Sequence, residues 1–387
     1  MRVAMVIQAY YPHVGGAEKQ LAALIPLLQR QGIDVHILTR RYPGMKPFES
    51  VFGVPVHRIP VPGPKALAAL SYTIGCLWSL ARLRPDLVHA HELLSPTTTA
   101  IAAKRLFHIP IVAKILRGGE LGDLAKLKSR GSGLSRINLI RRWVDAFIVI
   151  SQEIDRELAG IGIEPERRFF IPNGVDIERY RTVSQAEKMS IRARLGIYGD
   201  PVAIFTGRFV PEKRVNYLVD MWPAVRRRIP AAELLLLGDG PELGMLRQRA
   251  GSGVHFTGEV EDVLPYLQAA DLFVLPSSTE GLSNSLLEAM AVGLPCLATS
   301  VGGASDLLEH GKSGWIVKPN DPALLEQSVI HLLSEEQLWA GLGEQARRMV
   351  SQNYALDKSV QNLLRLYRDL TSIKLPDSGG RYSSKTT

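Results

Sequence analysis

The sequence predicts an α/β protein with two doubly wound domains, each built on a parallel sheet. Short apolar, β-branched runs alternate with helix-length amphipathic segments along the chain. The length of 387 residues also exceeds what a single hydrophobic core usually serves. We therefore expect domains over 1–175 and 176–355, a helix over 356–373 that packs back on the first domain, and a disordered tail over 374–387.

The first half opens with a clear strand–helix–strand unit. An apolar run over 2–8 predicts a strand, a loop then carries Gly15 and Gly16, and apolar residues recur at helical spacing up to Gly32. Further strands are predicted at 35–39, 87–90, 111–115, 146–150 and 169–171. The longest uncharged stretch, 66–81, falls short of the ~20 apolar residues that span a bilayer, so we expect a buried helix there.

The second half repeats the pattern after a turn-rich region that contains Pro-Asn-Gly at 172–174. Strands are predicted at 202–206, 234–237, 254–256, 272–275, 296–298 and 315–317, and the chain is helical from Pro322 onward. The boundary between the domains is expected near 172–183.

Composition narrows the function classes. A formal charge of +8 favours an anionic partner, which is a nucleotide, a nucleic acid or a lipid surface. Cys76 and Cys296 are far apart in apolar runs, which argues against a disulfide framework or a thiolate metal site. A reducing, cytoplasmic compartment fits this cysteine usage.

Two glycine-containing turns follow predicted strands of the second half. Gly207 ends one strand, and Arg208 and Lys213 follow in a loop before a helix, so two cations can meet one anion at the carboxyl edge of the sheet. A diphosphate suits such a site. The alternative, given equal weight, is that Arg208 and Lys213 are simply loop residues exposed to solvent. Gly238 opens the second turn, which is weak evidence by itself, because such turns usually need glycine for structural reasons.

The segment 276–291 is more specific. Glu280 lies in a loop after a strand, and Glu288 lies in a helix whose N-cap is expected to be Ser283. Carboxylates accept strong hydrogen bonds from paired hydroxyls, so both suit a sugar or a ribose. The alternative is that Glu280 only forms a capping box with Ser277.

These motifs together resemble the retaining glycosyltransferase family 4, the glycosyl transferases group 1. The resemblance covers nearly the whole chain and rests on motifs that occur in this order: Gly15-Gly16-Ala-Glu18, Ile171-Pro-Asn-Gly-Val-Asp176, Gly207-Arg208 with Lys213, Glu280-x7-Glu288 and Gly302-Gly303. It implies the GT-B fold, in which two Rossmann-like domains face each other across a cleft. It also implies transfer of a sugar from a nucleotide diphosphate sugar to an acceptor hydroxyl with retained anomeric configuration, as in cell-surface glycan or glycolipid synthesis.

The resemblance assigns roles to the residues of these motifs. Arg208 and Lys213 would neutralise the diphosphate and, with Glu280 on the sugar, form the catalytic group. Glu288 would bind the ribose. The remaining donor-binding residues would be Gly15, Gly16, Gly207, Gly238, Gly281, Leu282, Ser283 and Asn284. No metal or other cofactor is expected, because the sequence has no D-x-D of the diphosphate-binding kind and the two cations can replace that charge.

The acceptor side is less well defined. His89 and His91 share a face of one strand, yet two imidazoles without a third ligand make a poor zinc site. His91 fits the acceptor side of the cleft. Relatives often carry a histidine after the strand at 111–115, whereas this chain departs from the pattern there, and we expect Arg117, Glu120 and Asp123 to line the acceptor side. Asp306 is a second departure, since relatives usually have glutamate at that position.

The segment 124–142, from Leu124 to Arg142, has six basic residues, no acidic residue and several interspersed leucines and isoleucines. It can lie on an anionic membrane surface, which would make the protein peripheral at the inner face of the membrane, or it can be a loop and a solvated helix beside the acceptor.

Three alternative functions are weighed against this one. The nearest is a GT-B sugar-nucleotide epimerase. A noncatalytic nucleotide- or nucleic-acid-binding protein is more remote, because neither a helix-turn-helix nor an RNP-like pattern occurs and the charge is dispersed, so we expect no nucleic-acid partner. The first strand also lacks a dinucleotide fingerprint, which disfavours an NAD-dependent oxidoreductase.

Overall fold

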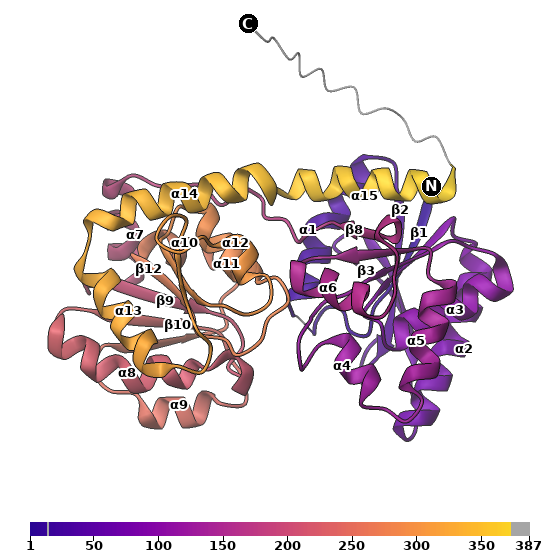
Figure 1. Cartoon of the computed structure of the whole chain (residues 1–387), viewed down its shortest axis with the longest axis horizontal. Helices are drawn as coiled ribbons and strands as arrows, with labels where there is room; N and C mark the ends of the chain where they lie inside the picture. Colours follow the sequence, from indigo (N-terminus) through magenta and orange to yellow (C-terminus); the bar gives the residue numbers. More distant parts are fainter. Residues whose placement is uncertain (14, 373–387) are drawn as a thin grey trace, which may run out of the picture.

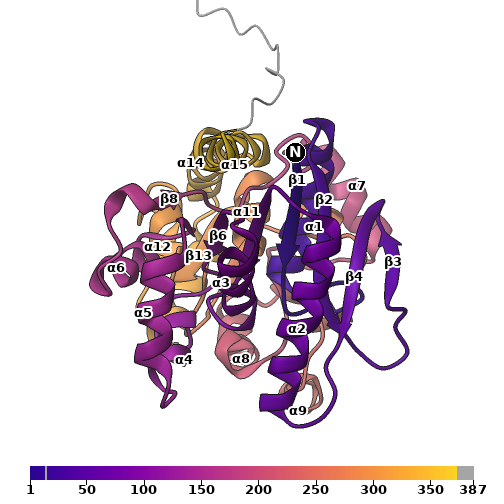
Figure 2. The same cartoon turned by 90° about the vertical axis from the view of Figure 1, so that its right-hand side faces the viewer.

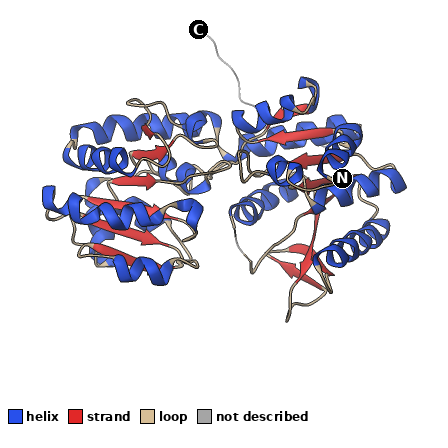
Figure 3. Cartoon of the chain, turned by 60° about the horizontal axis from the view of Figure 1, so that its bottom comes forward, coloured by secondary structure: helices blue, strands red, loops and turns tan. Residues whose placement is uncertain are grey.

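The computed structural model describes residues 1–13 and 15–372, which form two α/β domains that share a C-terminal helical segment (Figure 1). Each domain contains one mainly parallel sheet with helices on both faces (Figure 3). The fold class predicted from the sequence is therefore confirmed. The predicted tail over 374–387 and the last residue of the predicted final helix lie outside the described residues.

The first sheet has the strand order β3-β4-β2-β1-β5-β6-β7-β8, with only the β3–β4 pair antiparallel. Apolar residues fill nearly all its central strands because helices cover both faces. Its strands are β1 (Arg2–Val6), β2 (Asp34–Arg41), β3 (Phe48–Val51), β4 (Val54–Pro60), β5 (Leu87–His91), β6 (Ile111–Lys114), β7 (Ala146–Val149) and β8 (Arg168–Phe170).

The sequence analysis missed the hairpin of β3 and β4. Its turn is only Phe52 and Gly53, both with positive φ, and each strand is short. Pro55 and Pro60 within β4 also mask its strand pattern, because proline is usually a sign of strand edges and turns.

The helices of the first domain are α1 (Gly16–Arg30), α2 (Lys65–Leu83), α3 (Ser95–Phe107), α4 (Asp123–Lys128), α5 (Gly133–Trp143) and α6 (Gln152–Gly160). Helices α2, α3 and α5 pack in sequence as one layer on the sheet. Figure 2 shows them side by side on the face of this domain that is turned away from the second domain.

The expectation of a buried helix at 66–81 is half wrong. The helix exists as α2, but only one of its sides faces the core. Leu67, Leu70, Ile74 and Trp78 are each more than half exposed. The error arises because a helix without charged residues has no polar side to mark which of its faces packs against the core and which faces solvent. No helix in the described part of the chain is long and apolar enough to cross a membrane.

The second sheet is fully parallel, with the order β11-β10-β9-β12-β13-β14. Its strands are β9 (Val202–Thr206), β10 (Glu233–Leu237), β11 (Val254–Gly258), β12 (Leu272–Leu275), β13 (Cys296–Thr299) and β14 (Trp315–Val317). Its helices are α7 (Gln185–Leu195), α8 (Val215–Arg228), α9 (Leu243–Arg249), α10 (Leu264–Ala269), α11 (Asn284–Ala291), α12 (Ala304–Leu307) and α13 (Pro322–Ser334).

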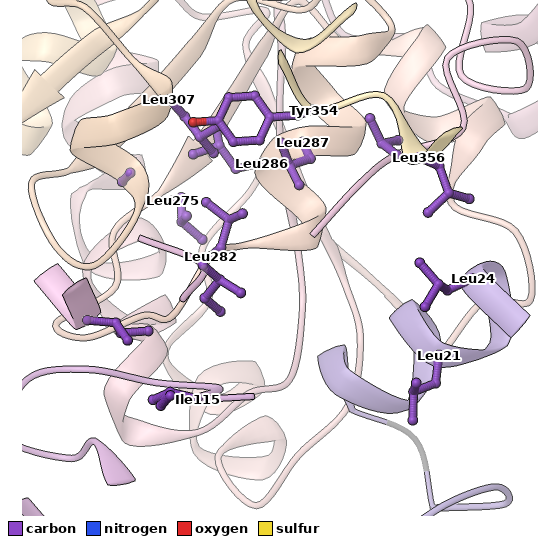
Figure 4. Packing of buried hydrophobic residues seen from close by; sticks show 14 of the residues in the cluster. Leu21, Leu24, Ile115, Leu275, Leu282, Leu286, Leu287, Leu307, Tyr354 and Leu356 are labelled. Atoms are coloured by element: carbon purple, nitrogen blue, oxygen red, sulfur yellow. The ribbon is translucent and has the colours of Figure 1, made fainter. Parts of the chain in front are cut away.

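Two helices connect the domains at their top in Figure 1. Helix α14 (Gln337–Asn353) packs on α11, and α15 (Leu356–Thr371) packs on α1 of the first domain. Between them, Val175 and Ala355 form a β-bridge, so the two segments that pass between the domains are paired there. Figure 4 shows apolar side chains at this junction, with Leu21 and Leu24 of α1 below Leu356.

One buried hydrogen bond anchors α15 to the first sheet. The hydroxyl of Tyr367 lies 2.7 Å from Nδ1 of His89 on β5, and both residues are buried. Burial raises the pKa of Tyr367 well above its usual value and lowers that of His89 to about 3, so both side chains are neutral. The final helix is thereby held by a specific polar contact besides its apolar face.

We predict that Tyr367→Phe lowers the free energy of unfolding by ~1–3 kcal/mol, because it leaves Nδ1 of His89 buried without a partner. Urea denaturation followed by circular dichroism measures the change. The matched control is Tyr354→Phe, since that hydroxyl donates only one long bond, 3.4 Å, to the carbonyl of Asp306. Equal losses of stability in the two variants would contradict the role assigned to the buried pair.

Candidate active site in the interdomain cleft

A cleft of about 980 Å³ opens between the carboxyl edges of the two sheets. Strand order reverses between β1 and β5 in the first sheet and between β9 and β12 in the second. The loops that leave these four strands separate there, which creates the crevice where doubly wound folds bind ligands. The two crevices face each other and form one cavity.

The structure brings almost all the sequence-predicted site residues to this cavity. Glu120 is the exception, because it is exposed and is not among the residues that line the cleft. The predicted residues that line it are Gly15, Gly16, His91, Arg117, Asp123, Gly207, Arg208, Lys213, Gly238, Glu280, Gly281, Leu282, Ser283, Asn284 and Glu288.

Glu280 and Lys213 form an ion pair at the floor of the second domain. The Nζ of Lys213 lies 2.5 Å from Oε1 of Glu280, and the hydroxyl of Ser277 donates to the same oxygen at 2.6 Å. Helix α11 begins only at Asn284, with Ser283 as its N-cap. Ser277 and Glu280 therefore do not form a capping box, and Glu280 is a nearly buried carboxylate held by a cation and a hydroxyl.

Arg208 is exposed to the cleft and faces the first domain. Its charge lowers the pKa of Glu18 on α1, although burial has the larger effect and raises that pKa overall. The backbone N–H of Gly15 donates to the Glu18 carboxylate at 2.8 Å. The start of α1, the start of α11 and Arg208 thus all line the cleft.

Glu288 lies on α11 with its carboxylate almost enclosed. Burial raises its pKa to about 7, while the charge of Lys19 and a hydrogen bond with Tyr180 act in the opposite direction. The raised pKa means that Glu288 gains a negative charge only as the pH rises through about 7. Lys19 belongs to the first domain, so the ionised form depends on both domains.

Three buried groups line the first-domain side. The rings of His89 and His91 stack with centroids 4.3 Å apart, and burial lowers the pKa of His91 well below its usual range. Both imidazoles are therefore neutral. Lys114 lies beside them, and burial lowers its pKa to about 8. In the described part of the chain, no group of three or more His, Cys, Asp or Glu side chains is arranged to hold a metal ion.

A chain of amide contacts joins Lys114 to the second domain. Its Nζ donates to Oδ1 of Asn173 at 2.9 Å, and Nδ2 of Asn173 donates to Oδ1 of Asn284 at 3.0 Å. Nδ2 of Asn284 then donates across the cleft to the carbonyl of Gly16 at 2.8 Å. The sequence analysis missed Lys114 as a site residue, and it placed Asn173 in the 171–176 motif without assigning it a contact, because their partners lie in other elements of the fold.

Glu92 is a further site residue that the sequence analysis missed. It follows β5 directly and has φ of +83°, a backbone conformation that is costly for glutamate. Burial, and next the charge of Asp123, raise its pKa to about 7. Nε2 of Gln8 donates to it at 2.6 Å. Its position after a strand beside the two histidines was the available signal.

Asp123 and Arg117, which were expected on the acceptor side, form contacts within the protein, and so does Asp306. Asp123 is buried and accepts the backbone N–H of Leu93 at 3.0 Å, which fixes the loop after β5. Arg117 lies 3.6 Å from Glu212 of the second domain. The carboxylate of Asp306, the second departure from the family pattern, accepts the N–H of Gln152 at 2.8 Å, at the start of α6.

Two glycines are required by close backbone approaches. A β-carbon at Gly281 would lie 2.1 Å from the carbonyl oxygen of Leu116 in the other domain. A β-carbon at Gly238 would lie 1.9 Å from the carbonyl of Gly207. Gly238 therefore has the structural reason that the sequence analysis considered, whereas Gly281 allows the two domains to touch.

Comparison with known proteins gives the family of the chain. Residues 200–335 match the family described as glycosyl transferases group 1, and residues 14–179 match glycosyltransferase family 4. The N-acetyl-alpha-D-glucosaminyl L-malate synthase of Bacillus anthracis is 26% identical over 93% of this chain and 95% of that protein. A GDP-mannose-dependent alpha-(1-6)-phosphatidylinositol monomannoside mannosyltransferase of Mycobacterium tuberculosis is 33% identical over 49% of this chain and 52% of its own length.

Solved structures share the fold. The crystal structure of Anabaena HepE in complex with UDP-glucose matches with a TM-score of 0.80 and 22% identity, over 96% of this chain and all of that one. The sucrose-phosphate synthase of Thermosynechococcus elongatus matches with a TM-score of 0.80 and 21% identity, over 96% of this chain and 99% of that one.

We predict that Gly281→Ala keeps the two domains from closing, because the added methyl group cannot occupy the space next to the Leu116 carbonyl. Backbone amides near Leu116 should then exchange hydrogen about tenfold faster or more, as expected for a locally opened contact. Mass spectrometry of exchanged peptides measures this. Gly244→Ala on α9 is the control, since no atom lies within 4 Å of the added β-carbon. Unchanged exchange in Gly281→Ala would show that the contact does not limit closure.

Proposed function

Since the chain belongs to the group 1 glycosyltransferases of family 4, we propose that it transfers a sugar from a nucleotide diphosphate sugar to an acceptor hydroxyl with retention of anomeric configuration. One observation carries this proposal. Arg208, Lys213, Glu280 and Glu288 line a single cleft between the domains, together with the starts of α1 and α11. Such a set matches the anionic and hydroxyl-bearing parts of a sugar nucleotide.

The diphosphate is proposed to lie between the two helix starts. Helix N-termini offer free N–H groups and a positive dipole end to anions. Arg208 is exposed toward the same place, and Lys213 keeps two further N–H donors besides the one directed at Glu280. The fold shared with HepE, whose structure contains UDP-glucose, supports this placement.

The two carboxylates are proposed to divide the hydroxyls of the donor. Glu280 lies beside Lys213 and would accept hydroxyls of the transferred sugar. Glu288 lies on α11 and would accept both ribose hydroxyls in its ionised form. Leu237 and Val260 line the cavity beyond Gly238 and would contact the base.

The chemistry then needs no protein nucleophile. In the proposed front-face reaction the bond from the anomeric carbon to the diphosphate oxygen breaks as the acceptor oxygen bonds to the same face. The departing diphosphate takes the acceptor proton. Arg208 and Lys213 stabilise the charge that develops on the leaving group, which replaces the role of a metal ion. Holding both substrates in register supplies much of the remaining rate enhancement.

The acceptor is proposed to enter from the first domain. Glu92, Arg117 and Lys126 line that side and can bind hydroxyls or phosphates of a sugar or of a lipid-linked sugar. The relative from Mycobacterium tuberculosis is named for a phosphatidylinositol mannoside, which supports a lipid-linked acceptor. A cytoplasmic position at the inner face of a membrane belongs to the same proposal.

The activity is tested with the donor first identified by a thermal-shift screen of nucleoside diphosphates and their sugars. We predict release of nucleoside diphosphate that depends on an acceptor and is undiminished in EDTA. Arg208→Ala should lower turnover more than ~tenfold, since a lost contact to transition-state charge typically costs at least that much. Arg227→Ala is the control, because Arg227 is equally exposed and lies outside the cleft lining. Strict dependence on Mg²⁺, or wild-type turnover of Arg208→Ala, would contradict the proposed mechanism.

We predict distinct effects for the two carboxylates. Glu288→Gln should weaken binding of both the free nucleoside diphosphate and the intact donor, whereas Glu280→Gln should weaken only the donor, by ~1.5–3 kcal/mol. Donor affinity of the wild type should fall as the pH is lowered through about 7, because Glu288 becomes protonated. Titration calorimetry from roughly one pH unit below that pKa to roughly one unit above it measures all three effects. Equal losses of nucleoside diphosphate affinity in the two variants would refute the division of roles.

A further inference from the structure

Helix α2 presents a continuous apolar stripe to solvent. Leu67, Leu70, Ile74 and Trp78 recur at helical spacing and are 51%, 56%, 57% and 58% exposed. The next outward position is Ala81, also exposed. No charged residue occurs between positions 66 and 81. Four large apolar side chains in one row differ from the scattered exposed residues that soluble surfaces normally carry.

The stripe cannot turn inward, because the other side of α2 is fixed. Tyr72, Cys76 and Leu80 are fully buried on that side. The hydroxyl of Tyr72 donates to the carbonyl of Ile7 at 3.0 Å. The apolar stripe therefore faces outward because the fold fixes the orientation of α2. It does not depend on the rotamer of any one side chain.

The neighbouring helices extend the apolar surface. Helix α3 contacts α2, and α5 contacts α3, so the three form one layer on the outer face of the first domain (Figure 2). Leu106 on α3 is 62% exposed, and Leu134 on α5 is 75% exposed. We call the outward surface of α2, α3 and α5 the outer face.

The outer face carries only one sign of charge. Helices α2, α3 and α5 contain no aspartate or glutamate. Among the side chains that the structure describes, the basic residues number one on α2, two on α3 and three on α5: Arg82, Lys104, Arg105, Arg136, Arg141 and Arg142. Lys104 is paired with Asp145, which follows α5, so the charge of these helices is partly balanced but stays positive overall. An apolar stripe beside a net positive charge matches a surface that is negative outside and apolar beneath.

Arginines stack on tryptophans at one edge of this face. Each of the three helices ends just before a parallel strand, β5, β6 or β7, so their C-terminal ends share an edge of the sheet. There the guanidinium of Arg82 lies 3.4 Å from the ring centroid of Trp78, and that of Arg142 lies 5.5 Å from that of Trp143. Tryptophan and arginine are side chains that suit the headgroup region of a bilayer.

We propose that the outer face docks on the surface of an anionic phospholipid bilayer, with α2 lying flat at the headgroup level. A second copy of the chain fits less well, because a symmetric pairing of this face would oppose two sets of like charges. Within the sequence-predicted segment 124–142, Ile137 and Ile140 are buried, so α5 contributes its basic residues together with Leu134 and Leu139. The apolar contribution comes chiefly from α2.

The docked orientation connects the membrane to the cleft. Helix α4 packs on α5, and its residues Asp123 and Lys126 line the cleft. Helix α2 also begins on the side of the sheet where the cleft opens, since it follows the carboxyl end of β4. Only helix α4 would then separate the bilayer surface under α5 from the cleft, so a lipid-linked acceptor at that surface would lie near the site. This consequence rests on the proposed function, whereas the docking itself does not.

The test is sedimentation of the full chain with vesicles of phosphatidylglycerol and phosphatidylcholine in equal parts. Wild-type protein should bind them, and binding should weaken as salt rises. The double variant Ile74→Glu with Trp78→Glu should bind the vesicles at least about tenfold more weakly than the wild type. It places two negative charges where two large apolar side chains are proposed to insert. The matched control, Met189→Glu with Tyr198→Glu, changes residues 52% and 85% exposed on the second domain and should bind like the wild type.

Affinity for a nucleoside diphosphate is measured on the same proteins and should be equal in all of them, which separates this proposal from that of the donor site. Wild-type binding by the α2 variant would overturn the proposal, as would equal binding of the wild type to vesicles of phosphatidylcholine alone. A dimer in solution that the α2 variant converts to monomer would overturn it as well, because the occupant of the stripe would then be a second copy.

Discussion

The parallel order of the two sheets is the constraint on which the rest of the structure depends. In a parallel sheet every strand ends at the same edge, and a reversal of strand order leaves a gap between two outgoing loops. Both domains have this reversal, at β1/β5 and at β9/β12. Because the two gaps face each other, residues as distant in sequence as Gly16 and Asn284 come within a hydrogen bond. No single loop could supply cations, carboxylates and helix starts to one cavity.

Closure of the two domains then determines the electrostatics of the cleft. Gly281 approaches the Leu116 carbonyl, and Asn173 contacts Asn284. These contacts between the domains limit the access of water to ionisable side chains of the cleft. Burial raises the pKa of Glu288 and Glu92 to about 7 and lowers that of Lys114 to about 8. The charges of these three groups therefore change near neutral pH, whereas the same side chains in full contact with water would be ionised there.

The first domain uses its two sides differently. Its carboxyl edge faces the cleft, and its α2–α3–α5 layer faces away from the second domain. Burial of α2 against the sheet satisfies one apolar side, and nothing in the described chain covers the other. The same helix layer thus stabilises the fold and leaves a row of apolar side chains among basic residues. Surface and site are linked through the α4–α5 segment, which belongs to both.

Periodicity and motif order alone determined the fold class, because alternation of strand and helix patterns is a local property of the chain. They also placed Arg208, Lys213, Glu280 and Glu288 in one site, since loops that follow parallel strands must meet at one edge. The hairpin of β3 and β4 escaped prediction because its strands are short and contain proline. The contacts of Lys114, Asn173 and Glu92 could not be predicted from sequence spacing, because they arise from burial and from partners in other elements. The tertiary structure alone decided that α2 is half exposed, since an apolar helix has no polar residue to mark its outer side.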